Sequence, residues 1–238
     1  MLKNKKLNLI LVALFVALET ALFFLVQTTS GDTCDAVSYS AVVLACLFML
    51  TNLAKTKNYA LMQIGLICTV MADLFLVVLE PMKQLPAMIF FSGTQICYFL
   101  RLYFNQKSQK EKNIHLIIRA GVSVFAIILT IIVLKDGTDA LSLVSMFYYA
   151  NLILNVIVAF TQCKISILFS LGLLLFLCCD TVVGLRAMTD YIQIENSSEL
   201  ASSLFGTLNW AWIFYVPSQS LIALSLTKFK NETNTKIA

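Results

Sequence analysis

Eight runs of mostly apolar residues alternate with short polar breaks along the chain. They lie near residues 7–26, 36–53, 60–79, 86–104, 114–134, 140–160, 165–185 and 204–226. A helix that crosses the hydrocarbon core of a bilayer needs about 20 predominantly apolar residues. The pattern therefore predicts an all-α, polytopic membrane protein with an eight-helix transmembrane bundle. No break could hold a soluble domain, so we expect residues 1–226 to form a single transmembrane domain and residues 227–238 to form a polar tail.

The composition excludes several classes of protein. Apolar residues make up 59% of the 238 residues and charged residues 13%, and the mean hydropathy is +0.85. A soluble globular enzyme or a disordered chain carries far more polar and charged residues. The single histidine, His115, rules out catalysis by two or more histidines. The seven cysteines form neither a disulfide pattern nor a C-x-x-C motif, and the net charge of +4 does not indicate a nucleic-acid partner. We expect no metal and no cofactor.

The positive charges predict the orientation, because short cytoplasmic loops carry most lysines and arginines. If the N-terminus is cytoplasmic, all but three of the 17 Lys and Arg residues fall on the cytoplasmic side; the exceptions are Lys83, Lys135 and Arg186. We therefore expect both termini in the cytoplasm. Arg119 lies about one turn inside the fifth run and is expected to extend to the cytoplasmic interface. The Lys- and Asn-rich polar ends and compact loops are typical of a bacterial plasma membrane protein.

A short motif occurs once in each half of the chain. Residues 65–73 and residues 172–180 both read G-L-x6-D, with Asp73 and Asp180 eight residues after a glycine. Each motif follows two predicted helices of its half and precedes one more. The repeat indicates two parallel four-helix halves, although a match this short also arises by chance.

Three acidic residues lie inside the predicted helices, namely Glu19, Asp73 and Asp180. A carboxylate is costly in hydrocarbon, so such residues face the interior of a bundle and usually mark a functional site. All three lie at a similar depth, in the outer half of the membrane. The same layer is expected to include polar stripes on three further helices: Ser92, Gln95 and Tyr98; Ser145, Tyr148, Asn151 and Asn155; and Asn209, Trp212, Tyr215 and Gln219.

Two interpretations of this layer stay open. In a functional site, one of two neighbouring carboxyl groups would be protonated and the other ionised, which provides an acid and a base. Alternatively, the polar side chains only join helices through hydrogen bonds. Clustered acids also serve as proton relays, so a proton-coupled transporter is a competing function. A non-catalytic, lipid-binding membrane protein is a third.

The motif around Asp73 resembles the first signature of the YhhN-like membrane proteins, the family that includes the lysoplasmalogenases. This signature has a glycine, an aspartate eight residues later, and a polar residue followed by x-x-Tyr in the next helix, as in Gln95 and Tyr98. The second signature is similar to Gly172, Asp180, Tyr215 and Gln219. The chain departs from the family pattern at Ala72, at Gln95, where the family often has His, and at Cys179, where it often has Ser. It therefore resembles a divergent member.

The resemblance implies hydrolysis of the vinyl ether bond of a lysoplasmalogen, a lysophospholipid-like substrate, to a fatty aldehyde and a glycerophospho-base. It places the acid and the base at Asp73 and Asp180, without assigning which is which. The substrate-binding residues it suggests, together with the polar layer, are Gln95, Tyr98, Asn209, Tyr215, Gln219, Glu19 and Asn151. Neither the headgroup preference nor the oligomeric state follows from the sequence.

Overall fold

The computed structural model describes residues 5–51, 57–106, 108–162, 166–188 and 210–227, and all regular structure within these ranges is helical. The α-helices are α1 (Lys5–Thr28), α2 (Asp32–Thr51), α3 (Lys57–Asp73), α4 (Gln84–Asn105), α5 (Gln109–Leu134), α6 (Ala140–Thr161), α7 (Ile167–Met188) and α9 (Trp210–Leu224). A π-helical turn, Leu74–Val78, extends α3, and a short 3-10 turn, Lys135–Gly137, follows α5.

Seven of these helices are long and apolar enough to cross a membrane. They are α1 to α7, with α3 counted together with its π-helical turn, and they coincide with the first seven apolar runs of the sequence to within five residues. The described part of α9 has 15 residues and is shorter than a typical span of about 20 residues. The eighth expected run, 204–226, begins outside the described residues.

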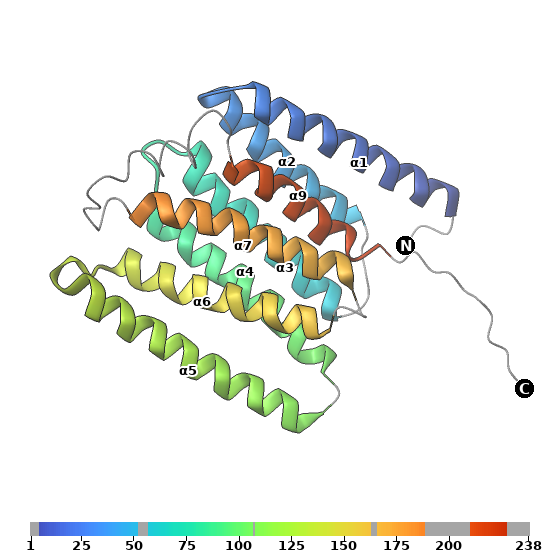
Figure 1. Cartoon of the computed structure of the whole chain (residues 1–238). Coiled ribbons are helices and arrows are strands. Elements are labelled where there is room, and N and C mark those ends of the chain that lie inside the picture. Colours follow the sequence, from blue (N-terminus) through green and yellow to red (C-terminus); the bar gives the residue numbers. More distant parts are fainter. Residues whose placement is uncertain (1–4, 52–56, 107, 163–165, 189–209, 228–238) are drawn as a thin grey trace, which may run out of the picture.

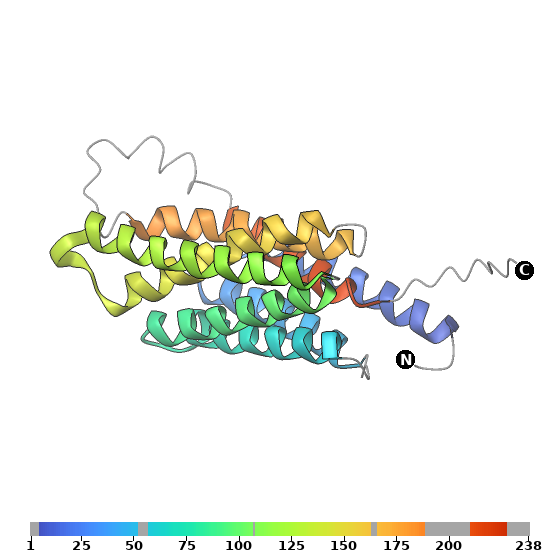
Figure 2. The ribbon, with the colours of Figure 1, turned by 90° about the horizontal axis from the view of Figure 1, so that it is seen from below.

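The helices run side by side along one axis (Figures 1 and 2). Helix α1 lies at one edge of the bundle against α2 and α9, and α5 lies at the opposite edge against α6. Between them, α3 packs on α4, α4 on α6, α6 on α7, and α7 on α9. Helix α1 begins and α9 ends at the same end of the bundle (Figure 1). This end also contains the connection from α4 to α5, and we call it the α4–α5 end.

Local sequence signals set the ends of two helices. Gly31, with φ of +58°, takes the left-handed conformation that allows a tight turn between α1 and α2. Asp139 caps α6, because its carboxylate accepts from the Ser142 backbone N–H at 2.7 Å while the Ser142 hydroxyl accepts from the Asp139 N–H at 3.1 Å. This reciprocal pair satisfies N–H groups that have no partner inside the helix.

Two glycines let neighbouring helices approach closely. A Cβ on Gly65 would lie 2.8 Å from Tyr98 Cε1 on α4, and a Cβ on Gly172 would lie 2.7 Å from Ile222 Cγ1 on α9. The Thr94 hydroxyl of α4 donates to the Gly65 carbonyl at 3.1 Å. The Ser218 hydroxyl of α9 donates to the Gly172 carbonyl at 2.8 Å. The glycines of the two G-L-x6-D motifs therefore join α3 to α4 and α7 to α9 by matching contacts.

Candidate functional site

Asp73 is the last residue of α3, immediately before the helix widens into its π-helical turn. Its side chain is 3% exposed. The hydroxyl of Tyr215 on α9 donates a hydrogen bond to Asp73 Oδ2 at 2.6 Å. The contact joins two residues that are 142 positions apart and ties the end of α3 to the first half of α9.

Asp180 has the corresponding partner on another helix. The hydroxyl of Tyr148, on α6, donates to Asp180 Oδ2 on α7. Tyr148 is buried, whereas Asp180 is partly exposed. The charges of Asp73 and Asp180 are close enough to interact electrostatically. We call Asp73, Asp180, Tyr148 and Tyr215 the acid cluster.

Aromatic rings connect the two tyrosines of the acid cluster. Phe91 on α4 lies 5.6 Å from Tyr148 and 5.9 Å from Phe176, measured between ring centroids. Phe176 on α7 lies 5.5 Å from Tyr215, which in turn contacts Trp212 at 5.6 Å. Such tilted and edge-on pairs at 4.5–7 Å are favourable aromatic contacts. The rings of Phe91 and Phe176 therefore link Tyr148, the partner of Asp180, to Tyr215, the partner of Asp73.

A tyrosine hydroxyl contacts each aspartate of the acid cluster. Each carboxyl group accepts from a phenolic O–H, and a phenol in this position fixes the orientation of the carboxyl. Within the described residues, no three His, Cys, Asp or Glu side chains are grouped so that they could hold a metal ion.

Glu19 lies at a separate position, between α1 and α9. Its side chain is 5% exposed, and Oε2 accepts a hydrogen bond of 3.0 Å from the Ser220 hydroxyl. The other carboxyl oxygen, Oε1, has no hydrogen-bond partner. Gln219, the residue beside Ser220, is 1% exposed, and neither atom of its amide has a partner. The single layer of three acids expected from the sequence is therefore divided, and Glu19 pairs with α9 instead.

Gln95 and Asn151 belong to a second polar network, between α4, α5 and α6. Asn155 Nδ2 donates to Gln95 Oε1 at 2.9 Å. Arg119 on α5 donates to Asn151 Oδ1 at 2.5 Å and to Asn155 Oδ1 at 2.7 Å. Arg119 was expected to extend to the interface; in the structure it is half-buried, and two amide oxygens on α6 hold its guanidinium. Asn155 is seven residues from Tyr148, or about 10 Å along the helix axis.

Tyr98 does not join the acid cluster. The Tyr98 ring packs on Gly65 and lies edge-on to Phe169, with centroids 5.5 Å apart. Since Gly65 precedes Asp73 by eight residues, Tyr98 lies about 12 Å from Asp73 along the bundle. Asn209 lies outside the described residues. Among the expected binding residues that the structure describes, Tyr215 is the one with a hydrogen bond to a catalytic candidate.

The contacts of Tyr148 and Arg101 could not be predicted from the sequence pattern. Tyr148 was placed in a polar stripe, but nothing in that pattern identified it as the partner of Asp180. Arg101, which falls within the predicted run 86–104, is 6% exposed and donates to Met62 Sδ at 3.1 Å and Ser225 Oγ at 3.2 Å. Its guanidinium also lies 4.0 Å from the centre of the Phe169 ring. The signal available for Arg101 was its position within a continuous helical pattern, three residues after Tyr98.

A comparison with protein-family models finds one that covers most of the chain. The YhhN family model matches residues 35–226, which include all of the acid cluster. No curated protein and no solved structure matches the chain.

Proposed function

The chain belongs to the YhhN family, and on this basis we propose that it is a membrane-embedded hydrolase of the lysoplasmalogenase type. Its substrate would be a lysoplasmalogen or a related ether lysolipid. The reaction would cleave the vinyl ether bond and release a fatty aldehyde and a glycerophospho-base. The pairing of Asp73 with Tyr215 and of Asp180 with Tyr148 is the observation that carries this proposal.

Hydrolysis of a vinyl ether needs a group that donates a proton to the double bond and a group that accepts a proton from the attacking water. Protonation of the vinylic carbon farther from the ether oxygen converts the double bond into an oxocarbenium ion. Water then adds to the carbon attached to oxygen and loses a proton, which gives a hemiacetal. The hemiacetal breaks its bond to the glycerol oxygen, and that oxygen takes a proton. The net reaction consumes one water molecule and returns the catalyst to its initial protonation state.

The acid cluster provides the groups that these steps require. A protonated carboxyl would give the first proton, and a carboxylate would stabilise the cation and accept the proton from water. Glycosidases divide the same work between two carboxyl groups. The two tyrosine hydroxyls would hold the carboxyl groups in position. Asp180 is partly exposed and Asp73 is almost fully buried, so we place the approach of the lipid on the Asp180 side.

The decisive experiment measures aldehyde release from a lysoplasmalogen by the purified full chain. Replacing either acid, as in Asp73→Asn or Asp180→Asn, should lower turnover by at least about 100-fold, the usual contribution of a general acid or base. Asp136→Asn is the matched control, since Asp136 is exposed in the turn after α5. Turnover retained in both cluster variants would refute the assignment of Asp73 and Asp180.

Isotopes test the chemistry independently of the mutations. In deuterated water, the aldehyde should carry one deuterium on the carbon next to the carbonyl. In water enriched in oxygen-18, the glycerol product should keep its original oxygen, because the bond between oxygen and the vinylic carbon breaks. A labelled glycerol oxygen or an unlabelled aldehyde carbon would contradict protonation at carbon.

A folded wild-type protein that releases no aldehyde would exclude the hydrolase. The two alternatives predict different results with the same variants. A proton-coupled transporter would show uptake that depends on a pH gradient and on Asp73 or Asp180. A non-catalytic lipid-binding protein would show neither turnover nor uptake, and its carboxyl variants would change stability or lipid retention only.

The proposed membrane topology has eight crossings, with both termini in the cytoplasm. It is supported by α1 beginning and α9 ending at one end of the bundle (Figure 1). We also propose two four-helix halves, with α3 and α4 corresponding to α7 and α9. The matching contacts of Thr94 with Gly65 and of Ser218 with Gly172 support this correspondence.

A further inference from the structure

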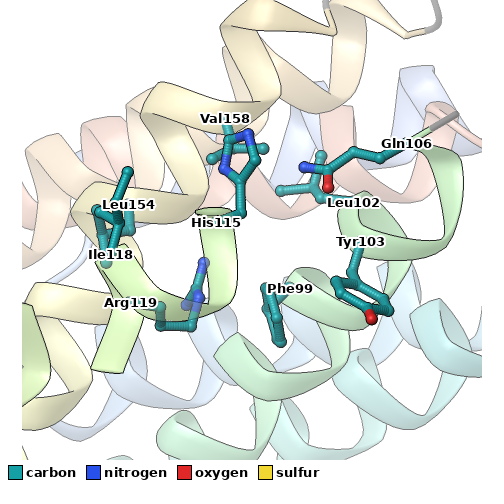
Figure 3. A pocket seen from close by; sticks show the side chains of 9 residues that line it. All are labelled: Phe99, Leu102, Tyr103, Gln106, His115, Ile118, Arg119, Leu154 and Val158. Carbon is teal, nitrogen blue, oxygen red and sulfur yellow. The ribbon is translucent and has the colours of Figure 1, made fainter. Parts of the chain in front are cut away.

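We propose that a pocket at the α4–α5 end of the bundle binds the phosphate of a phospholipid headgroup. Figure 3 shows this pocket between the last turns of α4, the first half of α5 and the second half of α6. It is separate from the acid cluster, and the proposal does not depend on the hydrolase. Two features of the pocket favour binding of an anion, and a third is an acceptor without a hydrogen-bond donor.

Arg119 is the first of these features. Its guanidinium is held by the Asn151 and Asn155 amide oxygens and lies 4.1 Å from the centre of the Phe99 ring. These partners are neutral, and no carboxylate of the described residues forms an ion pair with Arg119. A cation that is held rigidly in apolar surroundings without a counter-charge attracts an anion strongly. Two of its five N–H groups are used by the asparagines, so others are available to a phosphate.

A second basic side chain faces the same space. His115 lies one turn before Arg119 on α5, and its ring points into the pocket from the same side as the guanidinium (Figure 3). Lys112, three residues earlier, places its ammonium 5.5 Å from the centre of the Tyr103 ring. The spacing of three and four residues puts Lys112, His115 and Arg119 on one face of α5. The residues that line the pocket include no Asp or Glu.

Gln106, at the end of α4, is the third feature. The side-chain oxygen, Oε1, is buried and has no hydrogen-bond partner. Figure 3 shows the amide reaching over the pocket opposite Arg119. An N–H or O–H group that follows a phosphate, as in an ethanolamine or glycerol headgroup, would satisfy this oxygen. Inorganic phosphate alone at neutral pH offers fewer donors for it.

The outer wall of the pocket favours a lipid over a free anion. Ile118 lines the pocket and is 48% exposed, and it continues into the exposed side chains of Ile114 and Ile117 on α5. An apolar outer face on a membrane-spanning helix contacts acyl chains. A phospholipid whose chains lie along this face of α5 would therefore have its phosphate beside the pocket.

The test measures lipid retention on the purified full chain by native mass spectrometry. The probes are a phosphatidylethanolamine, a phosphatidylglycerol and a diacylglycerol with the same acyl chains, and inorganic phosphate. We expect the two phospholipids to be retained at least about tenfold better than the diacylglycerol, as charge-assisted hydrogen bonds would provide. Equal retention of the diacylglycerol would overturn the proposal, and so would phosphate that displaces the lipids at equal concentration.

Three variants make the test specific. Arg119→Gln should remove the preference for phospholipid, whereas Lys83→Gln, an equal charge change on an exposed residue at the opposite end of α4, should not. Because Arg119→Gln also disturbs the asparagine contacts, Ile118→Trp is a second test that fills the pocket and leaves those contacts in place. Unchanged phospholipid retention in Ile118→Trp or in folded Arg119→Gln would overturn the proposal. Asp180→Asn should retain the lipid, so failure of the hydrolase and failure of this site are distinguishable.

Discussion

The contact between α7 and α9 at Gly172 leads to a prediction with a defined sign. A Cβ at this position would lie 2.7 Å from Ile222 Cγ1, 3.1 Å from the Ile222 backbone N and 3.1 Å from the Ser218 carbonyl oxygen. Two of these atoms are backbone, so Gly172→Ala can be accommodated only if α9 moves away. That movement would also weaken the hydrogen bond from Ser218 to the Gly172 carbonyl.

The magnitude follows from three contributions to the free energy of unfolding. Forcing a methyl group into a packed contact costs about 1–3 kcal/mol, and weakening the Ser218 bond costs about 1 kcal/mol. Alanine is favoured over glycine in a helix by about 1 kcal/mol, which offsets part of the loss. We therefore expect Gly172→Ala to destabilise the protein by about 1–3 kcal/mol. For a domain of this size, each kcal/mol corresponds to about 2–4 °C in Tm.

Gly184 provides the control on the same helix. A Cβ there would meet nothing within 4 Å, so Gly184→Ala should raise stability by up to about 1 kcal/mol. Gly65→Ala should cost less than Gly172→Ala, because all three atoms nearest to a Cβ at Gly65 belong to side chains, whereas two of the three at Gly172 are backbone. Thermal unfolding in detergent, followed by tryptophan fluorescence, measures all three variants. Stabilisation by Gly172→Ala equal to that by Gly184→Ala would refute the close approach of α7 and α9.

Three further predictions follow from other contacts. Tyr148→Phe should reduce aldehyde release, because it removes the donor to the Asp180 carboxyl, whereas Tyr149→Phe, which removes only a contact with a threonine, should leave turnover unchanged; comparable losses in both would contradict a specific role. Ser220→Ala should lower stability by about 1–3 kcal/mol by leaving a buried carboxyl without its donor, whereas Ser40→Ala, which affects an exposed hydroxyl bonded to its own helix, should be neutral in the same unfolding assay. A phosphatase fused to the C-terminus should be inactive in a bacterial host, and an active fusion would reverse the proposed orientation.

The positions of the helices were predictable from the sequence, because each apolar run has about the 20 residues that a helix needs to cross the membrane. The first seven runs coincide with α1 to α7. The acids at Asp73 and Asp180 were also identifiable, since ionisable residues inside such runs are rare. The position of a residue within its run indicates its depth in the membrane, and the helical period indicates the face of the helix on which it lies.

The neighbour that each face meets was not predictable in the same way. Tyr215 on α9 reaches Asp73 on α3, although α9 packs on α7, whereas Tyr148 on α6 reaches Asp180 on the adjacent α7. Glu19 faces Ser220 on α9, because α1 lies at the edge of the bundle against α2 and α9. The order of helices around the bundle is a three-dimensional property, and the short repeat of two glycines did not encode it.

The partners of Arg119 and Arg101 also depend on how the helices are arranged. A basic residue near the end of a predicted span usually extends toward the interface. Arg119 instead meets two amide oxygens on α6, and Arg101 meets a thioether, a hydroxyl and an aromatic ring. The orientation is predicted from the distribution of all Lys and Arg residues together. The contacts of a single arginine depend on the partners that other helices place beside it.

The partners of Arg101 also have a consequence for the biogenesis of the protein. Helix α4 emerges from the ribosome long before α9, and Ser225 is 124 positions after Arg101 in the chain. Until then, the nascent chain carries in α4 an arginine that lacks the hydroxyl of Ser225 as a partner. Synthesis of α9 and the residue that follows it supplies this hydroxyl. If translation stops before α9, Arg101 therefore lacks the Ser225 hydroxyl and keeps only Met62 and Phe169 as partners.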